Sequence, residues 1–377
     1  MGKRVCLVTS AHRVRYTRFF DREAVSLARA GYEVSLVGLG APDDAAREQD
    51  VSLVPVPARG GVRKAATLRD IHRVVRELEP DVCHCFDPWA MAVGLRLGRE
   101  LPSAVLVYDS TELFPDAFSD RDDLPWPLPV IGCRSIEVIE ARAARRCAAV
   151  IETNPTRAAR FARHNVTPHI VGNYPPLELL PGIRPDREPW IAWTGLISRQ
   201  RGFDRLLRAF SRVAPDFPGS KLVVIGGFDP RSDIEKWAKA FLERSGLGER
   251  VELRGTVEYR EMFRQVARCL AGVILLQPER SNDYTGQPNK LFEFMGSGLA
   301  VVASGFPEMA GIIRQERCGS LVDPTDESAI AGALKAIFTQ PAQALETGRR
   351  GRVAVEREYN WSSAESVLLK VYEGLFR

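Results

Sequence analysis

The sequence predicts an α/β protein built from two doubly wound domains that face each other across a cleft. Short apolar segments alternate with segments of helical periodicity along most of the 377 residues, which is the pattern of parallel sheets covered by helices. The alternation stops once, between residues 173 and 189, where five prolines occur without periodicity. The length also exceeds that of one typical hydrophobic core, which favours two domains.

The first domain is predicted over residues 1–174. A strand at 4–10, a helix at 18–30 and a strand at 32–39 form a β-α-β unit, which implies parallel strands joined by a right-handed crossover. The same alternation continues to the end of the domain. Further strands are expected at 51–56, 82–86, 104–109, 149–153 and 169–172, and further helices at 62–79, 88–99, 131–147 and 155–164.

The second domain is predicted over residues 190–360, after a semi-rigid proline-rich linker at 175–189. A last helix within 361–377 has an apolar stripe and is expected to return to the first domain. Strands of the second domain are expected at 190–194, 221–225, 251–254, 272–276, 299–303 and 320–322, and helices at 203–213, 232–245, 259–267, 288–298 and 326–339.

Composition excludes several classes of protein. The 52 basic and 48 acidic residues leave a net charge of only +4, whereas a dedicated nucleic-acid binder concentrates positive charge. The sequence has no apolar run long enough for a membrane span, and its start lacks the features of a signal peptide. Seven cysteines show no disulfide spacing. We therefore expect a cytoplasmic protein without nucleic-acid partners.

The triplet Cys83-His84-Cys85 resembles a metal-binding cluster. It lies in a predicted strand, where neighbouring side chains point to opposite faces. Three consecutive residues of a strand cannot close around one ion, and no second ligand pair follows at zinc spacing. We expect a structural role for the triplet and no metal.

The loop after the first strand carries His12, Arg13, Arg15 and Arg18. It follows the carboxyl end of a strand, where open α/β sheets bind ligands. The loop has no glycine, so a nicotinamide-dinucleotide turn is disfavoured. The arginines are compatible with an acidic acceptor or with peripheral contact to a membrane.

Glycines follow two strands of the second domain. The loop from Gly195 to Gly202 holds Arg199 and Arg201 at the start of a helix, a favourable place for a phosphate group. Alternatively, these are ordinary surface arginines. Gly226-Gly227 permits close approach of a ligand to the backbone, or forms a tight turn.

Residues 281–304 are predicted as a polar loop, a short helix and a buried strand. Asn289, Lys290 and Glu293 share one face of that helix. A helix N-terminus beside a lysine suits a phosphate, and a carboxylate one turn later suits the hydroxyls of a ribose. From this segment alone, an exposed ion pair explains Lys290 and Glu293 equally well.

Taken together, these segments resemble the group 1, or family 4, retaining glycosyltransferases of GT-B fold, over nearly the whole chain. In the first domain the likeness lies in residues 20–31, Pro80-Asp81 and residues 108–115. In the second it lies in residues 194–202, 223–227 and 288–298, the last being the most specific. The resemblance implies two Rossmann-like domains and a hexosyltransferase-type enzyme of carbohydrate or natural-product biosynthesis.

The resemblance also implies roles for individual residues. Arg201 and Lys290 would contact the diphosphate of a nucleotide-sugar donor, Glu293 the ribose, and the backbone near Val257 the base. Two fixed cations can stabilise a leaving diphosphate, so neither a metal nor another cofactor is expected. The catalytic residues implied are Arg201, Lys290 and Thr111, the other donor-side residues Gly195, Arg199, Gly227, Val257, Asp283, Thr285, Asn289 and Glu293, and the acceptor-side residues His12, Arg13, Arg15, Asp109 and Glu112.

Two positions depart from the family pattern. Thr285 stands where the family has a glutamate, although Asp283 is close by, and Thr111 stands where it has a histidine. Threonine donates a hydrogen bond but carries no proton charge near neutrality. Two alternatives to sugar transfer therefore stay open: a nucleotide-sugar-binding protein with lost or altered chemistry, and a sugar-nucleotide epimerase. The expected acceptor is a saccharide, a lipid-linked compound or a small metabolite.

Overall fold

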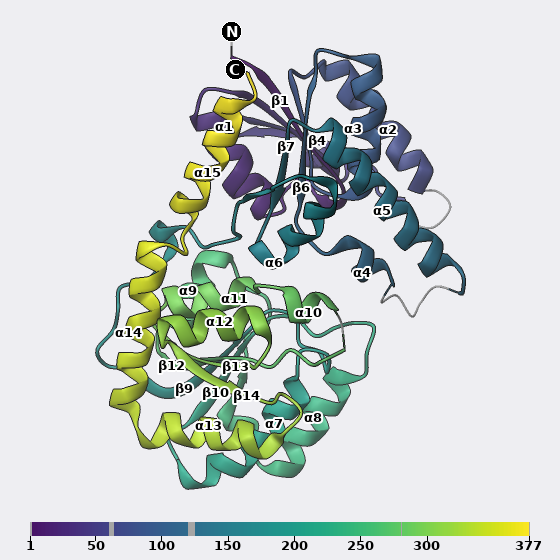
Figure 1. Ribbon diagram of the computed structural model, residues 1–377. Coiled ribbons are helices and arrows are strands. Elements are labelled where there is room, and N and C mark those ends of the chain that lie inside the picture. Colours follow the sequence, from purple (N-terminus) through teal and green to yellow (C-terminus); the bar gives the residue numbers. More distant parts are fainter. Residues whose placement is uncertain (1, 60–63, 120–124, 280, 377) are drawn as a thin grey trace. The chain divides into compact units, whose positions relative to one another are not determined.

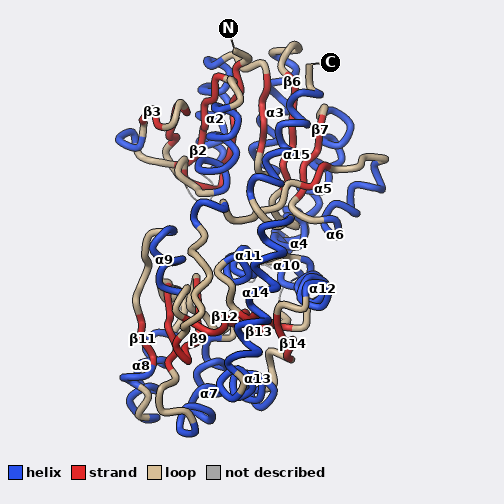
Figure 2. Tube along the Cα trace, turned by 90° about the vertical axis from the view of Figure 1, so that its left-hand side faces the viewer, coloured by secondary structure: helices blue, strands red, loops and turns tan. Residues whose placement is uncertain are grey.

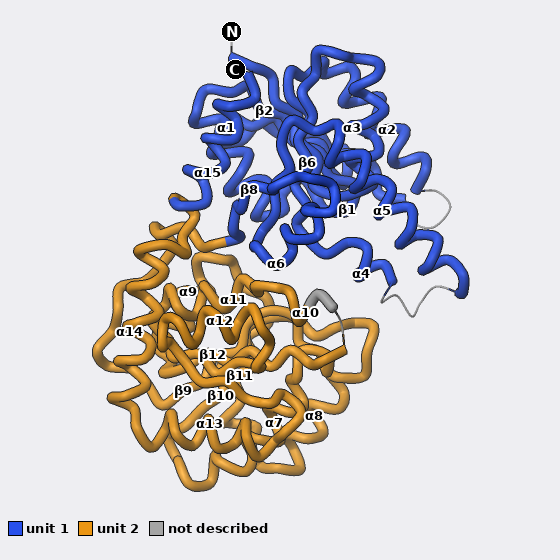
Figure 3. The backbone as a smooth tube through the Cα atoms, viewed as in Figure 1, with its two compact units in different colours: residues 1–173, 363–377 blue, residues 174–362 orange. Residues whose placement is uncertain are grey.

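The computed structural model describes residues 2–59, 64–119, 125–279 and 281–376, and it divides into two compact units (Figures 1 and 3). Unit 1 comprises Met1–Asn173 and Ser363–Arg377, and unit 2 comprises Tyr174–Ser362. The division falls beside the start of the expected linker, and the last residues of the chain group with unit 1. Both units contain a parallel sheet with helices, which confirms the predicted fold class.

The described part of unit 1 has an eight-stranded sheet in the order β3-β4-β2-β1-β5-β6-β7-β8. The short β3 pairs antiparallel with β4, and the other pairs are parallel. The strands are β1 (Arg4–Arg13), β2 (Glu33–Leu39), β3 (Ala46–Glu48), β4 (Val51–Val56), β5 (Val82–Cys85), β6 (Val105–Ser110), β7 (Ala149–Glu152) and β8 (His169–Ile170).

Three long helices of unit 1, α2, α3 and α5, cover one face of this sheet (Figure 1). Their buried side chains, such as Val75, Leu97 and Ile139, meet the strands in one core. The helices are α1 (Val25–Arg29), α2 (Lys64–Leu78), α3 (Pro88–Glu100), α4 (Phe114–Ser119), α5 (Leu128–Arg146), α6 (Pro155–Ala158) and α15 (Trp361–Gly374), with a π-helix at Arg18–Ala24 and a 3₁₀-helix at Ala159–His164.

The described residues of unit 2 form a six-stranded, fully parallel sheet in the order β11-β10-β9-β12-β13-β14. Figure 2 colours the strands red and the helices blue. One core lies under α7, α8 and α13, and a second under α9, α11, α12 and α14. The elements are β9 (Glu188–Thr194), α7 (Phe203–Val213), β10 (Lys221–Ile225), α8 (Ile234–Ser245), β11 (Val251–Leu253), α9 (Tyr259–Val266), β12 (Cys269–Ile274), α10 (Ser281–Thr285), α11 (Asn289–Gly296), β13 (Ala300–Ser304), α12 (Pro307–Glu316), β14 (Gly319–Val322), α13 (Glu327–Thr339) and α14 (Pro341–Arg357).

The structure differs from the predicted elements in several places. β1 continues to Arg13, because Arg13 pairs with Leu39 of β2 after an irregularity that follows Val8. In that irregular stretch the Thr9 hydroxyl accepts the amides of residues 11 and 12, and Asp87 accepts that of residue 10. Part of the expected loop at 281–287 is the helix α10, and helices α12 and α14 were not predicted. The proline-rich segment also packs against the second core of unit 2 through Leu177, Leu179 and Leu180, so it is more than a spacer.

Candidate functional site

Glycines bring two backbone segments together at the carboxyl ends of β9 and β10 in unit 2. The amide of Gly195 donates to the carbonyl of Ile225 at 2.9 Å. A Cβ atom on Gly226, whose φ is +149°, would lie 1.9 Å from the carbonyl oxygen of Gly195. Only glycine therefore fits at residue 226, and the sheet ends in two closely packed turns without side chains between them.

Arg201 lies against the first of these turns. Its Nη1 atom is 3.2 Å from the place that a Cβ of Gly195 would occupy. The next residue, Gly202, has a φ of +78° and begins α7, and a Cβ there would lie 2.3 Å from the carbonyl oxygen of Leu275. The two glycines thus fix the loop and leave room for the half-buried guanidinium beside β9.

Lys290 is a buried cation in the first turn of α11, with only 7 % of its surface exposed. Its Nζ lies 4.8 Å from the ring centroid of Trp193 on β9 and has no hydrogen-bond partner among the described residues. Burial, together with the charge of Arg201, lowers the pKa of Lys290 to about 7, although Glu293 and Asp283 oppose the shift. Within the described part of the chain, the site therefore holds a buried cation without a hydrogen-bonded counter-ion.

Glu293 lies one turn after Lys290 and is also buried. Its carboxylate accepts a hydrogen bond of 2.9 Å from the Tyr259 hydroxyl on α9. Asn289, the first residue of α11, is half-buried. The structure thus brings Lys290 and Glu293 together in a buried setting, and the alternative of an exposed surface pair is wrong.

Two arginines hold the carboxyl end of α11. Arg187 donates to the carbonyls of Ser297 and Cys269 at 2.7 and 3.0 Å, and Arg352 donates to that of Gly296 at 2.6 Å. Burial lowers the pKa of Arg187 to about 10. Cations at this end complement the helix dipole and satisfy terminal carbonyls. The helix that carries Lys290 is therefore anchored at the end away from that residue.

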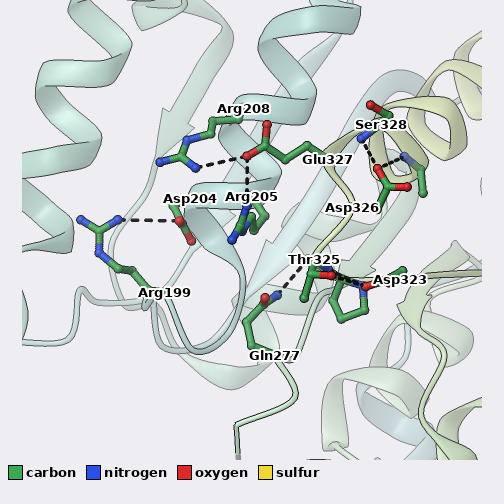
Figure 4. Close-up of polar contacts among 12 residues, drawn as sticks. Arg199, Asp204, Arg205, Arg208, Gln277, Asp323, Thr325, Asp326, Glu327 and Ser328 are labelled. Carbon is green, nitrogen blue, oxygen red and sulfur yellow. Dashed lines mark hydrogen bonds and ion pairs between the residues drawn. The ribbon is translucent and has the colours of Figure 1, made fainter.

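Arg199 lies in a separate set of contacts, of which Figure 4 shows the pair with Asp204. Its guanidinium pairs with Asp233 at 3.1 Å and Asp204 at 3.7 Å and stacks over Trp237 at 5.2 Å. This differs from the expected donor contact, because a guanidinium held by two carboxylates is less available to a phosphate. In the same view Arg205 and Arg208 converge on Glu327, which ties α7 to α13.

Loop contacts join the remaining donor-side candidates. Gln200 donates through Nε2 to Asp283 at 3.4 Å, and its carbonyl accepts the amide of Gln277 at 2.9 Å. The Gln277 side chain in turn donates to the carbonyl of Pro324 at 3.1 Å (Figure 4). Asp283 and Thr285 lie on α10 and are half-buried. Gly227 and Val257 lie beyond the ends of β10 and β11, at the same sheet edge.

In unit 1, Asp109 at the end of β6 is fully buried within a cluster of charges. Arg18 lies 3.0 Å from both Asp109 and Glu23. Burial and the neighbouring Asp109 raise the pKa of Glu23, whereas Arg18 lowers that of Asp109 against the effect of burial. Asp109 is thus placed to position the residues that follow it, and Arg18 is not an exposed loop arginine as expected.

The same cluster includes three residues with metal-ligand atoms. Those of Glu23, His84 and Asp109 lie within 4.8 Å of one another. The Arg18 guanidinium already supplies the positive charge that an ion would bring. His84 Nδ1 is moreover 2.8 Å from the Tyr372 hydroxyl of α15. Arg18 and Tyr372 thus already contact these three residues, although His84 Nε2 and both carboxylate oxygens of Glu23 have no hydrogen-bond partner among the described residues.

Of the other acceptor-side candidates, His12 and Arg13 end β1, whereas Arg15, Thr111 and Glu112 follow β1 and β6. His12 is half-buried against the rings of Tyr16 and Phe19, at 4.3 and 5.3 Å, and burial lowers its pKa although Asp87 and Glu112 oppose the shift. The carbonyl of Thr111 accepts a hydrogen bond of 3.1 Å from Arg157. Glu112 and Arg13 are exposed, and Arg15 pairs with Glu48.

Sequence reasoning missed Trp193 and Tyr259, which touch Lys290 and Glu293. Trp193 has the sequence pattern of a core residue in a strand, so nothing in the sequence marked it as part of a binding site. Tyr259 begins a helix 34 residues before its partner, so no local spacing connects the two.

Two family models match the chain. "Glycosyl transferase 4-like domain" matches residues 16–173, and "Glycosyl transferases group 1" matches residues 188–340. Together they cover both units. The chain belongs to the family 4 glycosyltransferases of GT-B fold. The resemblance seen in the sequence is thereby confirmed, and the protein is an enzyme of the glycosyltransferase class.

Similar proteins agree with this assignment. Phosphatidyl-myo-inositol mannosyltransferase of Mycobacterium leprae is 24 % identical over 91 % of this glycosyltransferase and 88 % of its own length. Sucrose-phosphate synthase of Thermosynechococcus elongatus has a TM-score of 0.79 at 19 % identity, covering 99 % of both chains. The Anabaena protein HepE in complex with UDP-glucose has a TM-score of 0.75 at 13 % identity, covering 99 % of this chain and 100 % of its own.

Within the described residues, no helix of this glycosyltransferase combines the length and the hydrophobicity that a bilayer span requires.

Proposed function

We propose that this glycosyltransferase moves a sugar from a nucleotide-diphospho-sugar to an acceptor hydroxyl, with retention of configuration and without a metal. The donor would bind at the carboxyl edge of the unit 2 sheet. The HepE complex with UDP-glucose supports a donor of this class by similarity. The proposal includes no cofactor besides the donor itself.

The observation that carries the proposal is the state of Lys290. A buried ammonium without a hydrogen-bond partner among the described residues is costly unless a ligand compensates it. Arg201 lies near enough to lower its pKa further, so a second positive charge acts on the buried ammonium. A diphosphate at the N-terminus of α11 would provide two negative charges there. The site is thus prepared for an anionic ligand.

In the proposed reaction the acceptor oxygen bonds to the anomeric carbon as the bond from that carbon to the diphosphate oxygen breaks. The acceptor proton passes to the leaving phosphate on the same face of the sugar. Lys290 and Arg201 would stabilise the negative charge that develops on the diphosphate. Glu293, held by Tyr259, would accept the ribose hydroxyls.

At the sugar and at the acceptor, the proposed contacts differ from the family pattern. Asp283, whose carboxylate accepts a hydrogen bond from Gln200, would take the place of the glutamate that Thr285 replaces. Thr111 would offer a hydrogen bond where the family has a histidine, with His12 and Glu112 nearby on the acceptor side. The acceptor class remains a saccharide, a lipid-linked compound or a small metabolite. The mannosyltransferase relative, named for phosphatidyl-myo-inositol, favours testing lipid-linked acceptors first.

Transfer from a panel of radiolabelled nucleotide sugars to mixed acceptors tests the proposal. Arg201→Ala and Lys290→Ala should each lower turnover by roughly 10²-fold or more. Arg212→Ala and Lys239→Ala are matched controls on exposed helix surfaces of unit 2 and should transfer at the wild-type rate. NMR of the product gives the anomeric configuration, and EDTA treatment tests independence from metal.

Three results would contradict the proposal. Wild-type turnover in both site variants would show that the cations are misassigned. Release of an epimerised sugar nucleotide without an acceptor would identify an epimerase. Donor binding without transfer to any acceptor would favour a nucleotide-sugar-binding protein with lost chemistry.

A further inference from the structure

The segment between β6 and α4 of unit 1 carries Thr111 and Glu112, two of the acceptor-side candidates. Ser110, the last residue of β6, is completely buried, and its hydroxyl donates to the carbonyl of Glu112 at 3.2 Å. The carbonyl of Thr111 accepts a hydrogen bond of 3.1 Å from Arg157. The backbone of this candidate segment is therefore held by two side chains that are not candidates themselves.

Arg160, on the 3₁₀-helix that follows α6, connects Ser110 to two buried carboxylates. Its Nη2 atom donates to the Ser110 hydroxyl and, at 3.1 Å, to Glu140, to which Nε also donates at 3.3 Å. Its Nη1 atom donates to Glu152 and, at 2.8 Å, to the carbonyl of Arg157. A guanidinium has five N–H donors in a rigid planar fork, so these contacts engage all of them. Arg160 is thereby fixed in one orientation.

The two carboxylates around Arg160 lie in the interior of unit 1. The side chains of Glu140 and Glu152 are 1 % and 0 % exposed. Glu140 also accepts a hydrogen bond of 3.2 Å from the Tyr108 hydroxyl, and Glu152 accepts the amide of Thr153 at 2.9 Å. Burial raises the pKa of Glu152 to about 7, although Arg160 opposes the shift. Because desolvation offsets much of the attraction in a buried ion pair, what such a cluster mainly supplies is a defined geometry.

We infer that Arg160 is a positioning residue for sugar transfer, which acts through Ser110 and Arg157 to set the backbone of Thr111 and Glu112. The inference rests on the proposed function, in which Thr111 offers a hydrogen bond on the acceptor side. All five donors of Arg160 are engaged within unit 1, so the residue is not available to bind a substrate directly. Misplacement of a reacting group by about 1 Å can slow a reaction by about 10²-fold.

Arg160→Lys tests the inference, because lysine keeps the charge that Glu140 and Glu152 require but has three donors on a flexible stem in place of the rigid fork. We expect kcat/KM for the acceptor to fall by roughly tenfold or more. The Kd of the nucleotide sugar should stay unchanged, because the proposed donor site lies in unit 2. Ser110→Ala, which removes the connection and leaves all charges in place, should lower kcat/KM severalfold with the same unchanged Kd. Initial rates and calorimetric titration measure these values.

Two matched controls separate positioning from a general effect of substitution. Arg163→Lys changes an exposed arginine of the same 3₁₀-helix. Ser135→Ala removes a hydroxyl that donates only to the carbonyl of Ile131, one turn earlier in the same helix, among the hydrogen bonds of the described residues. Both controls should behave like the wild type. If the wild type is active and Arg160→Lys and Ser110→Ala keep its kcat/KM, or lose donor affinity in the same proportion, the inference is overturned.

Hydrogen exchange decides the matter without any transfer assay. In mass spectrometry, the peptide that contains residues 110–114 should exchange severalfold faster in Arg160→Lys and Ser110→Ala than in the wild type, whereas the two controls should leave it unchanged. Absence of sugar transfer by the wild type would count against the proposed function alone. Wild-type exchange of this peptide in both Arg160→Lys and Ser110→Ala would overturn the positioning role whether or not the enzyme transfers sugar.

Discussion

Each unit buries a cation at the carboxyl edge of its sheet, but the two cations differ in what surrounds them. Arg18 in unit 1 lies 3.0 Å from each of two carboxylates. Lys290 in unit 2 lies over the ring of Trp193 and has no hydrogen-bond partner among the described residues.

This difference distinguishes a cation whose counter-ions lie inside the unit from one that we propose to serve donor binding. Arg18 pairs with Glu23 and with Asp109, which joins the π-helix to β6. Among the described residues Lys290 Nζ has no hydrogen-bond partner, and Glu293 and Asp283 favour its charge without a hydrogen bond to it. Similar burial therefore leads to opposite expectations for stability and activity.

The largest predicted change is a loss of stability when one of the two carboxylates that pair with Arg18 is removed. Asp109→Ala would leave a buried guanidinium incompletely paired, and we expect the free energy of unfolding of unit 1 to fall by about 3 kcal/mol or more. Urea denaturation measures this value. Asp216→Ala, which breaks an exposed pair with Lys335, should leave it nearly unchanged. If Asp109→Ala lowered the free energy of unfolding as little as Asp216→Ala does, Arg18 would not depend on its buried counter-ion, and the contrast with Lys290 would be lost.

Lys290→Met should separate activity from stability. Transfer should fall by roughly 10²- to 10³-fold, while the ligand-free enzyme should become more stable at neutral pH, because the cost of burying an amine is removed. Initial rates and thermal unfolding of the same preparation check both expectations. A less stable variant would mean that Lys290 is compensated within the protein, as Arg18 is.

The affinity for the donor should depend on pH through Lys290. Its pKa is about 7 in the free enzyme, well below the ordinary value of about 10.4, so the lysine loses its charge as pH rises above 7. An anionic donor favours the protonated form, and its affinity should therefore fall by up to about tenfold per pH unit between 7 and 9. Calorimetric titration with a nucleotide sugar measures this slope. Lys290→Arg, whose charge is fixed, should give a flat profile, and a flat wild-type profile would contradict the assignment.

Tyr259→Phe should have a smaller effect on the same site. It removes the hydrogen bond to Glu293, and the KM for the donor should rise severalfold, corresponding to about 1 kcal/mol, with little change in kcat. The exposed Tyr284 provides the control Tyr284→Phe. A drop in kcat at unchanged KM would place Tyr259 closer to the reacting atoms than we propose.

The sequence predicted the parallel sheets and the donor-side helix well, because strand and helix periodicities are local. It placed Arg18 in an exposed loop, since the partner carboxylate of Asp109 comes 91 residues later. The sequence also did not decide whether Lys290 and Glu293 form an exposed ion pair or belong to a buried binding site. The contacts with Trp193 and Tyr259 that decide this question depend on tertiary packing, which no local pattern encodes.

Helix α15 has a consequence for how the protein is made. Residues 363–377 belong to unit 1, where the Tyr372 hydroxyl contacts the buried His84. Residues 174–362 are synthesised before them and form the whole of unit 2. On the ribosome, unit 2 can thus reach its native contacts first, although unit 1 begins the chain. A chain released before residue 363 would contain all of unit 2, but its unit 1 would lack the contact of Tyr372 with His84.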